Sequence, residues 1–440
     1  FFGYPGGAVI DIYDELANHP DLRHILVRHE QGAVHAADGY ARASGKVGVC
    51  LATSGPGATN TVTGIATAYS DSIPLVIFTG QVSTPLIGND AFQEVDIVGI
   101  TRPCTKHNFL VKDVRELAAT VRKAFYLARS GRPGPVLVDI PKNIQQATCD
   151  FEWPAEVTMR SYCPTFRANL NQLRRAMDVL LTSRKPLIVA GGGVIMADAA
   201  AELTTLAHLM HAPVCSTLMG LGAFPGDDPL WIGMLGMHGT YAANKSVNQA
   251  DVILAVGARF DDRVTGKLTE FAPNARIVHI DIDPTTLRKN VRVEVPVVSD
   301  ALSALQGLRS ILESGHAEKD WAGDHADWMA QVQEWQKKQP LSWSKGEVLK
   351  PQQVVERLYE LTKGEAIITT EVGQNQMWAA QFYKYHRPRT YLTSGGLGTM
   401  GYGLPAAIGA QLAFPDRLVV DVAGDGSIQM NSQELMTAVE

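Results

Sequence analysis

The stretch that decides the fold is VVDVAGDGS, at residues 419–427. Its first four residues predict a short strand, and the Gly-Asp-Gly that follows predicts a turn leading into a helix. Apolar, β-branched runs bounded by glycine or proline recur along the chain, with helical stretches between them. This alternation is typical of βαβ units. The sequence therefore predicts an α/β fold built on parallel sheets.

Ten runs of this kind, counting the one just quoted, divide the chain into three blocks. The predicted strands are Ile25–Val27, Val47–Ala52, Leu75–Phe78, Val136–Asp139, Leu187–Ala190, Val252–Val256, Ile277–Ile282, Val295–Val298, Ala366–Thr370 and Leu418–Val422. The blocks cover residues 1–150, 166–340 and 351–440, with linkers at 149–165 and, partly helical, 313–350. Each predicts a doubly wound parallel-sheet domain, the third incomplete. The chain starts without methionine and stops in a helix candidate, so we expect both ends to extend in the parent protein.

Composition narrows the class of protein. With 45% apolar and 19% charged residues and a net charge of −6, the chain gives no reason to expect a nucleic-acid or membrane partner. No apolar run approaches the roughly 20 residues of a membrane span. Five widely spaced cysteines argue against a thiolate metal site or a disulfide framework. We expect a cytoplasmic protein.

The Gly-Asp-Gly turn carries the strongest chemical signal. Gly424 and Gly426 allow a diphosphate to approach the backbone, and amides at the following helix start, including that of Ser427, can hold its oxygens. Asp425 offers the hard carboxylate oxygen that magnesium prefers. An ordinary strand-to-helix turn with an aspartate cap explains the same residues.

Other loops follow strands in the same way. Glu30 follows the first strand, where a helix-start charge is the simpler explanation. The loop TSGPGATN at 53–60, with Pro56 and Asn60, also fits a plain turn with a helix cap. In the third block, EVGQN at 371–375 and SGGLGTMG at 394–401 fit two ordinary turns.

Taken together, these motifs resemble the thiamine-diphosphate enzymes. The resemblance implies that Glu30 binds the ring nitrogen of the cofactor's aminopyrimidine and assists its proton transfer. It places Pro56, Asn60 and Gly398 beside the pyrimidine and makes Met400 the apolar wedge beneath the cofactor. The diphosphate contacts implied are Val372, Gly373, Gln374, Asn375, Gly424, Gly426 and Ser427, with Asp425 on magnesium.

The middle block makes the resemblance more specific, to acetohydroxyacid synthase. Its segments MLGMHG at 234–239, GARFDDR at 257–263 and HIDID at 279–283 resemble that family's FAD site, where the flavin is structural. The implied FAD contacts are Arg132, Gly191, Gly192, Gly193, Thr217, Leu218, Leu235, Gly236, Met237, His238, Gly257, Arg259, Asp261, Arg263, Asp281, Ile282 and Asp300.

The resemblance also implies the reaction and the partners. Phe92, Gln93 and Lys106 match active-site positions, and Arg263 matches the arginine that takes the carboxylate of the second keto acid. Pyruvate would be decarboxylated and its two-carbon remainder, the hydroxyethyl enamine, joined to pyruvate or 2-ketobutyrate, in the first common step of branched-chain amino acid synthesis. We expect a homodimer or dimer of dimers and a small regulatory subunit. A pyruvate oxidase and a non-catalytic FAD-binding paralogue remain alternatives.

Overall fold

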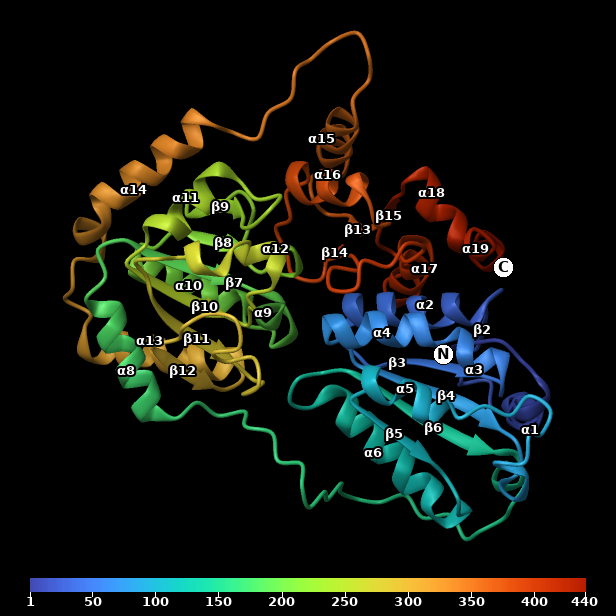
Figure 1. The fold of residues 1–440 in the computed structure, drawn as a ribbon. Coiled ribbons are helices and arrows are strands. Elements are labelled where there is room, and N and C mark those ends of the chain that lie inside the picture. The colour runs from blue at the N-terminus through green and yellow to red at the C-terminus, as the bar shows by residue number, and fades with distance from the viewer. The chain divides into compact units, whose positions relative to one another are not determined.

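The computed structural model describes residues 1–440, which form two compact units. Unit one holds residues 1–163, 366–376 and 392–440, and unit two holds 164–365 and 377–391. The three predicted blocks each carry one sheet (Figure 1). The third block is shared, because β13 and β15 of its sheet lie in unit one, its first helix belongs to unit two, and β14 lies at the boundary between them in sequence. The division into two compact units does not correspond to the three predicted domains, and the predicted domain boundaries remain a prediction.

The first sheet lies in unit one and has six strands in the order β2-β1-β3-β4-β6-β5. These are β1 (Phe2–Gly3), β2 (Ile25–Leu26), β3 (Gly48–Ala52), β4 (Leu75–Gln81), β5 (His107–Leu110) and β6 (Pro135–Pro141). All neighbours are parallel. The chain adds strands in one direction from β1 to β2 and then in the other from β3, so the order reverses between β1 and β3.

The helices of unit one join and cover these strands. They are α1 (Ile10–Leu16), α2 (Glu30–Ser44), α3 (Pro56–Asn60), α4 (Val62–Asp71), α5 (Ile97–Thr101), α6 (Leu117–Arg129), α7 (Lys142–Gln145), α17 (Gly403–Ala413), α18 (Asp425–Ile428) and α19 (Glu434–Val439).

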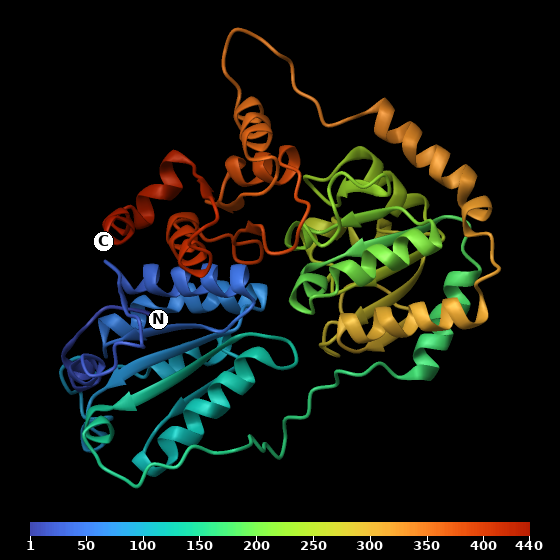
Figure 2. The same ribbon diagram turned by 180° about the vertical axis from the view of Figure 1, so that it is seen from behind.

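A smaller sheet of the third block completes unit one. It contains β13 (Ile367–Thr370), β14 (Tyr391–Leu392) and β15 (Val419–Val422) in the order β14-β13-β15, with β13 and β15 parallel. Its helix α17 packs on α2, as Figures 1 and 2 both show. A Cβ at Gly409 would lie 1.8 Å from the Ala36 carbonyl oxygen, and one at Gly39 would lie 2.2 Å from that of Ala406. Glycine at these two positions lets the helix backbones touch.

The second sheet forms the centre of unit two, in the order β12-β11-β10-β7-β8-β9. Its strands are β7 (Pro186–Ala190), β8 (Val214–Ser216), β9 (Trp231–Met234), β10 (Val252–Val256), β11 (Arg276–Asp281) and β12 (Val295–Val298). All neighbours are again parallel. The order reverses between β7 and β10.

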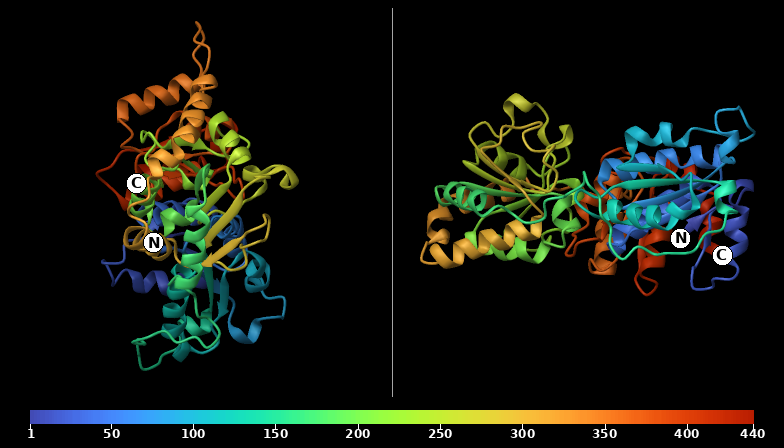
Figure 3. Two further views of the ribbon diagram at one scale, coloured as in Figure 1. Left: turned by 90° about the vertical axis from the view of Figure 1, so that its left-hand side faces the viewer. Right: turned by 90° about the horizontal axis from the view of Figure 1, so that it is seen from below.

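Apolar side chains are buried on both faces of this sheet, and helices lie on either side of it (Figure 3). Its helices are α8 (Leu170–Leu181), α9 (Gly192–Met196), α10 (Ala200–Met210), α11 (Tyr241–Gln249), α12 (Asp262–Thr265), α13 (Ala301–Gly315), α14 (Trp321–Lys338) and α15 (Pro351–Thr362), and α16 (Gln374–Phe382) runs in from unit one. Alternate strand residues face opposite ways: Ile188 packs with α8, α10 and α13, and Leu187 with α11 and α14. Such two-sided burial confirms the predicted doubly wound architecture.

All ten predicted strands are present, with ends shifted by a few residues. None of the helices combines the length and the apolar character that a bilayer crossing would need.

Candidate cofactor site

Glu30 is the first residue of α2, just past β2 at the carboxyl edge of the first sheet. His29 caps the helix, its Nδ1 accepting from the Gln31 amide at 3.1 Å. The Glu30 side chain is buried, and its Oε2 accepts a hydrogen bond from Asn60 Nδ2 at 2.9 Å. A Cβ at Gly57 would lie 3.1 Å from Glu30 Oε1. The structure thus brings Glu30 and the loop at 53–60 together.

The loop at 90–94 meets the same place through its backbone. Gln93 has a φ of +58°, and a Cβ at Gly55 would lie 2.9 Å from its carbonyl oxygen. Gly55 also has a positive φ, so glycine is needed there twice over. Phe92 beside it is 88% exposed. Gln93 therefore joins the Glu30 loop, while the Phe92 ring faces solvent.

Lys106 and Arg132 lie in other surroundings. The Lys106 ammonium donates to the carbonyls of Leu127 and Ser130, at the end of α6, and to the Tyr162 hydroxyl. The Arg132 Nε donates to Ser72 Oγ at 2.8 Å. These contacts fix α6 and the end of α4, and they do not bring either cation to Glu30.

The predicted diphosphate residues form a second group, on the small sheet. Asn375 Nδ2 donates to the Val422 carbonyl at 2.6 Å and to that of Glu371 at 3.0 Å, joining the loops that follow β15 and β13. Cβ atoms at Gly373 and Gly424 would lie 2.8 and 3.2 Å from Asn375 Oδ1. Gln374 and Asp425 are exposed beside them. The loops containing Val372–Asn375 and Gly424–Ser427 are therefore adjacent.

Glu371 is a central residue that sequence reasoning missed. It is fully buried; its Oε2 accepts from Ser427 Oγ at 2.6 Å and from the Gly401 amide at 2.8 Å, and its Oε1 from the Leu404 amide at 3.1 Å. Burial, and then repulsion by this carboxylate, raise the pKa of Asp421 to about 7. The sequence did contain a cue to this residue, because Glu371 is the first residue of the motif EVGQN and directly follows a predicted strand.

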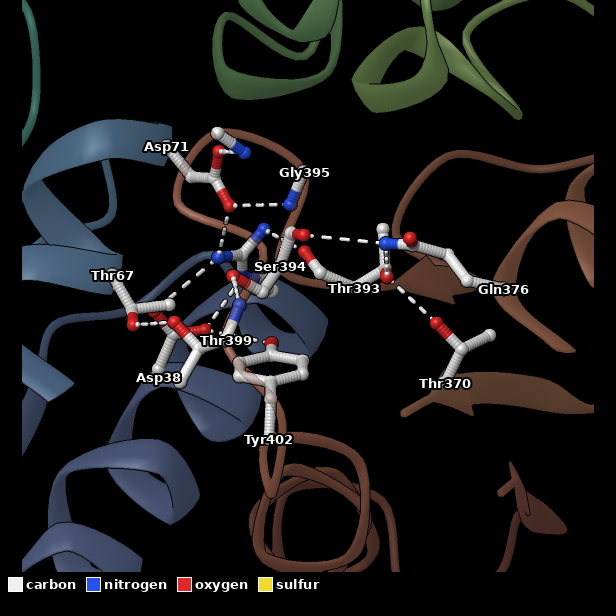
Figure 4. Close-up of polar contacts among 12 residues, drawn as sticks. Asp38, Thr67, Asp71, Thr370, Gln376, Thr393, Ser394, Gly395, Thr399 and Tyr402 are labelled. Carbon is white, nitrogen blue, oxygen red and sulfur yellow. Dashed lines mark hydrogen bonds and ion pairs between the residues drawn. The ribbon is translucent and has the colours of Figure 1, made fainter. Parts of the chain in front are cut away.

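The loop SGGLGTMG at 394–401 is anchored by buried charges of the first block (Figure 4). Arg42, Asp71 and Asp38 form an ion-paired cluster beneath it, and Tyr402 donates to Asp38 Oδ1 at 2.7 Å. Gly398, with a φ of +72°, has only a Val372 methyl within 4.0 Å of its Cβ position. Met400 is 38% exposed, and its Cε lies 3.9 Å from the Cβ position of Gly426.

The residues predicted for FAD follow the strands of the second sheet. The tightest contact lies where the strand order reverses: a Cβ at Gly191 would be 2.0 Å from the Gly257 carbonyl oxygen, and one at Gly193 2.6 Å from Gly257 Cα. Gly257 itself has a φ of +59°. In open parallel sheets, ligands bind at the carboxyl ends of strands beside such a reversal.

The remaining predicted contacts lie along the same edge. Met237 and Arg263 are exposed, with the Met237 amide donating to the Arg263 carbonyl at 2.8 Å and the guanidinium 3.8 Å from the Met237 sulfur. Asp281 Oδ1 accepts from the Asp283 amide at 2.8 Å. Thr217 and Leu218 follow β8, Leu235, Gly236 and His238 follow β9, Gly192 follows β7, Arg259 and Asp261 follow β10, and Ile282 and Asp300 follow β11 and β12.

Two of these acidic residues also have local structural roles. Asp261 and Asp300 cap α12 and α13, each accepting from two backbone amides. Burial raises the pKa of Asp300. Their carboxylates thus stabilise the first turns of the helices that follow β10 and β12.

Three family models match the chain. They are described as the N-terminal TPP binding domain, the central domain and the C-terminal TPP binding domain of thiamine pyrophosphate enzymes, and they match residues 1–100, 173–308 and 371–440. The isozyme 3 large subunit of acetolactate synthase from Escherichia coli K12 is 53% identical over 100% of the chain and 77% of its own length. The chain belongs to the acetolactate synthase family.

Two further relatives come from other organisms. The large subunit from Haemophilus influenzae is 50% identical over 100% of the chain and 77% of its own length. A probable large subunit from Methanocaldococcus jannaschii is 51% identical over 100% of the chain and 75% of its own length. The chain itself matches the thiamine-pyrophosphate-binding domain models in its first and last parts.

The residues present fit thiamine diphosphate. Gly398 and Gly426 leave open space where a side chain would stand, next to the apolar Met400. No cluster of three or more His, Cys, Asp or Glu side chains is placed to hold a metal. Asp425 is exposed and offers one carboxylate of the kind that magnesium takes together with phosphate and water oxygens.

Proposed function

We propose that the chain is the catalytic subunit of an acetohydroxyacid synthase. It converts two pyruvates to 2-acetolactate and carbon dioxide, or pyruvate and 2-ketobutyrate to 2-aceto-2-hydroxybutyrate and carbon dioxide, at the start of branched-chain amino acid synthesis. One observation carries the proposal. The chain is 50–53% identical, over its whole length, to relatives named acetolactate synthase. The burial of Glu30 is consistent with it.

Thiamine diphosphate, when bound, supplies a carbanion that attacks pyruvate and an electron sink for decarboxylation. The diphosphate and magnesium would be held by Gly373, Gln374, Asn375, Gly424, Asp425, Gly426 and Ser427. The pyrimidine would lie near Pro56, Asn60, Val372, Gly398 and Met400. Asn375 joins two of these loops, which supports a role in their spacing.

Glu30 holds a proton at the pyrimidine nitrogen in this proposal. Its burial and its hydrogen bond from Asn60 support that role, because the burial limits access of water and the hydrogen bond orients the carboxylate. Gln93, which lies against the same loop, would line the active site together with Phe92. The exposed Arg263 guanidinium can receive the second acid's carboxylate as a two-point fork. Lys106, which is tied to α6, positions that helix.

FAD would lie along the carboxyl edge of the second sheet. The reversal at Gly191–Gly193 and Gly257 supports this placement, as does a buried Ser216 Oγ at the end of β8 that has no hydrogen-bond partner. The flavin would be structural, since the condensation has no net redox change. Arg132 would be its contact from the first block.

The proposal includes an assembly. Glu30 and the diphosphate loops form two groups in one chain, which suits sites shared between chains of a homodimer or a dimer of dimers. The relatives are named large subunits, and a small regulatory subunit would be the partner here too. We propose a cytoplasmic location.

The test is acetolactate formation from pyruvate, with magnesium and FAD present, with and without thiamine diphosphate. We expect cofactor-dependent acetolactate and a flavin that stays oxidised. Acetate or acetyl phosphate with reduced flavin would move the protein to the oxidases. No turnover of pyruvate would favour the non-catalytic flavoprotein.

The role of Glu30 is tested by Glu30→Gln, which keeps the shape and the acceptor for Asn60 but cannot exchange the proton. We expect kcat to fall by about 100-fold or more, the usual worth of a positioned proton-transfer group. Glu15→Gln, at an exposed carboxylate in α1, is the matched control and should leave kcat unchanged. Equal activity of both variants would exclude Glu30 from the chemistry.

A further inference from the structure

A buried carboxylate of the first block holds the glycine-dense loop at 394–401. Asp71 Oδ1 accepts from the Gly396 amide at 2.7 Å, and Oδ2 from the Gly395 amide at 3.1 Å (Figure 4). Arg42 Nη2 also donates to Oδ2 at 2.9 Å, and its Nη1 donates to the Thr393 carbonyl at 2.9 Å. The start of the loop is therefore bonded, through backbone atoms alone, to one aspartate and one arginine.

The position of Asp71 is unfavourable without these partners. It is the last residue of α4, where the helix dipole opposes a negative charge, and it is 8% exposed. Arg42 is 5% exposed and shares its charge with Asp38, whose Oδ1 accepts from Nε at 2.5 Å. A buried carboxylate is stable there only because a guanidinium and two amides bond to it. The buried charge of Asp71 therefore depends on the loop at 394–401, which supplies the two amides.

The far end of the loop is held separately. Thr67 and Thr399 hydroxyls hydrogen bond at 2.6 Å, and the Gly401 amide donates to Glu371. Between the two anchors, Gly398 and Met400 are exposed. The anchored backbone fixes where these two residues lie.

We propose that Asp71, held by Arg42, is a positioning residue for thiamine diphosphate. It acts through the Gly395 and Gly396 amides and sets the place of Gly398 and Met400 against the cofactor's pyrimidine. This inference rests on the proposed function, because it concerns the same cofactor. Asp71 touches neither substrate nor cofactor.

The first test is Asp71→Asn, measured by calorimetric titration of the full chain with thiamine diphosphate and magnesium. An asparagine must place its NH₂ either at Oδ1, facing the Gly396 amide, or at Oδ2, facing both the Gly395 amide and the guanidinium, so at least one donor loses its acceptor. We expect the Kd for thiamine diphosphate to rise by about 10- to 100-fold, as for an unpaired buried donor. The KM for pyruvate and kcat at saturating cofactor should change little.

The second test, Gly396→Ala, leaves every buried charge in place. Its Cβ would lie 2.7 Å from Asp71 Oδ1, so the loop must move away, although Gly396 itself is exposed. We expect the same rise in Kd with less effect on thermal stability. The matched control is Asp139→Asn, another buried aspartate of unit one, which accepts from Thr79 and Gln81 and should leave Kd unchanged.

The outcomes separate the inference from the proposed function. If the unsubstituted chain fails to bind thiamine diphosphate, the proposed function is wrong. If it binds, and Asp71→Asn and Gly396→Ala bind equally well, only the positioning role is overturned. A Kd raised as much by Asp139→Asn would also overturn it, because general destabilisation would then account for the loss.

Discussion

Both units carry parallel sheets, yet the loops that follow their strands are stabilised differently. In unit one the loop at 394–401, which follows β14 of the small sheet, is tied by the buried charged side chains of Arg42, Asp71 and Glu371, which donate to or accept from backbone groups at its two ends. In unit two the loops meet backbone to backbone, at Gly191, Gly193 and Gly257. The first arrangement should therefore be sensitive to charge and pH, and the second to added volume.

The largest effect should come from adding one methyl group in unit two. Gly191→Ala places a Cβ 2.0 Å from the Gly257 carbonyl oxygen, between two backbones that cannot move independently. Gly191 has a φ of −102°, so the cost is steric and not conformational. We expect the free energy of unfolding of unit two to fall by about 4 kcal/mol or more, at the upper end for single substitutions.

Tryptophan fluorescence in urea measures this loss, because Trp153 is the only tryptophan of unit one and the others belong to unit two. Gly315→Ala, at the end of α13, is the control. Nothing lies within 4 Å of its Cβ position, and alanine should change stability by less than about 1 kcal/mol. Equal stability of Gly191→Ala and the unsubstituted chain would show that the loops are free to separate.

The next effect should appear in unit one, as a pH dependence. Burial and the Glu371 carboxylate raise the pKa of Asp421 to about 7. The folded state then holds a proton that an unfolded aspartate releases near pH 4, so this contribution to stability is complete below about pH 4 and lost as pH rises to about 7. Its upper limit is about 4 kcal/mol, at 1.4 kcal/mol per pH unit.

Asp421→Asn should abolish that contribution. The amide resembles the protonated acid, so the variant should be more stable than the unsubstituted chain at pH 8 and similar at pH 4. Hydrogen exchange of peptides containing β13 and β15, measured across this range, would show it. A variant that loses protection at pH 8 would mean that Asp421 is needed in its ionised form.

Unit two should show a dependence of opposite sign, through His279. Burial lowers the pKa of His279 to about 4, partly offset by its Nε2 hydrogen bond to the Ala258 carbonyl, and its buried Nδ1 has no partner. A neutral histidine is therefore favoured, and stability present above pH 6.5 is lost as pH falls towards 4. His279→Gln keeps a donor for Ala258 and should remove up to about 3 kcal/mol of that loss. Fluorescence-detected unfolding of both proteins at pH 7 and pH 4.5 checks this prediction. If the free energy of unfolding falls equally in the variant and the unsubstituted chain, His279 is not the source of the pH dependence.

The sequence predicted the parts of the fold that have strong local patterns. Long apolar runs such as Val252–Val256 were found, because burial on both faces makes such strands continuous. Five strands were missed, because runs of two to four residues carry too little periodicity: these are β1, β5, β8, β9 and β14. The division into two compact units depends on contacts such as that of α2 with α17, which lie far apart in sequence and leave no local pattern.

The candidate site divides in the same way. Glu30, Asn60 and Gln93 were predicted and lie together, and the diphosphate loops lie together as well. Arg42 and Asp71 were not predicted. A charged residue inside a helix is usually a solvated one, and nothing local reveals that the packing of α17 has buried these two.

The smallest effect should be that of a surface ion pair, which sharpens the contrast with the buried charges of unit one. Arg276 and Glu294 meet through two contacts of 2.7 and 2.9 Å, but their side chains are 43% and 44% exposed. Water and salt screen such pairs, so a double-mutant cycle with alanine should give a coupling of about 0.5 kcal/mol, reduced in 1 M salt. A coupling several times larger would mean that charges stabilise unit two as they do unit one, and the contrast between the units would then rest on the glycines alone.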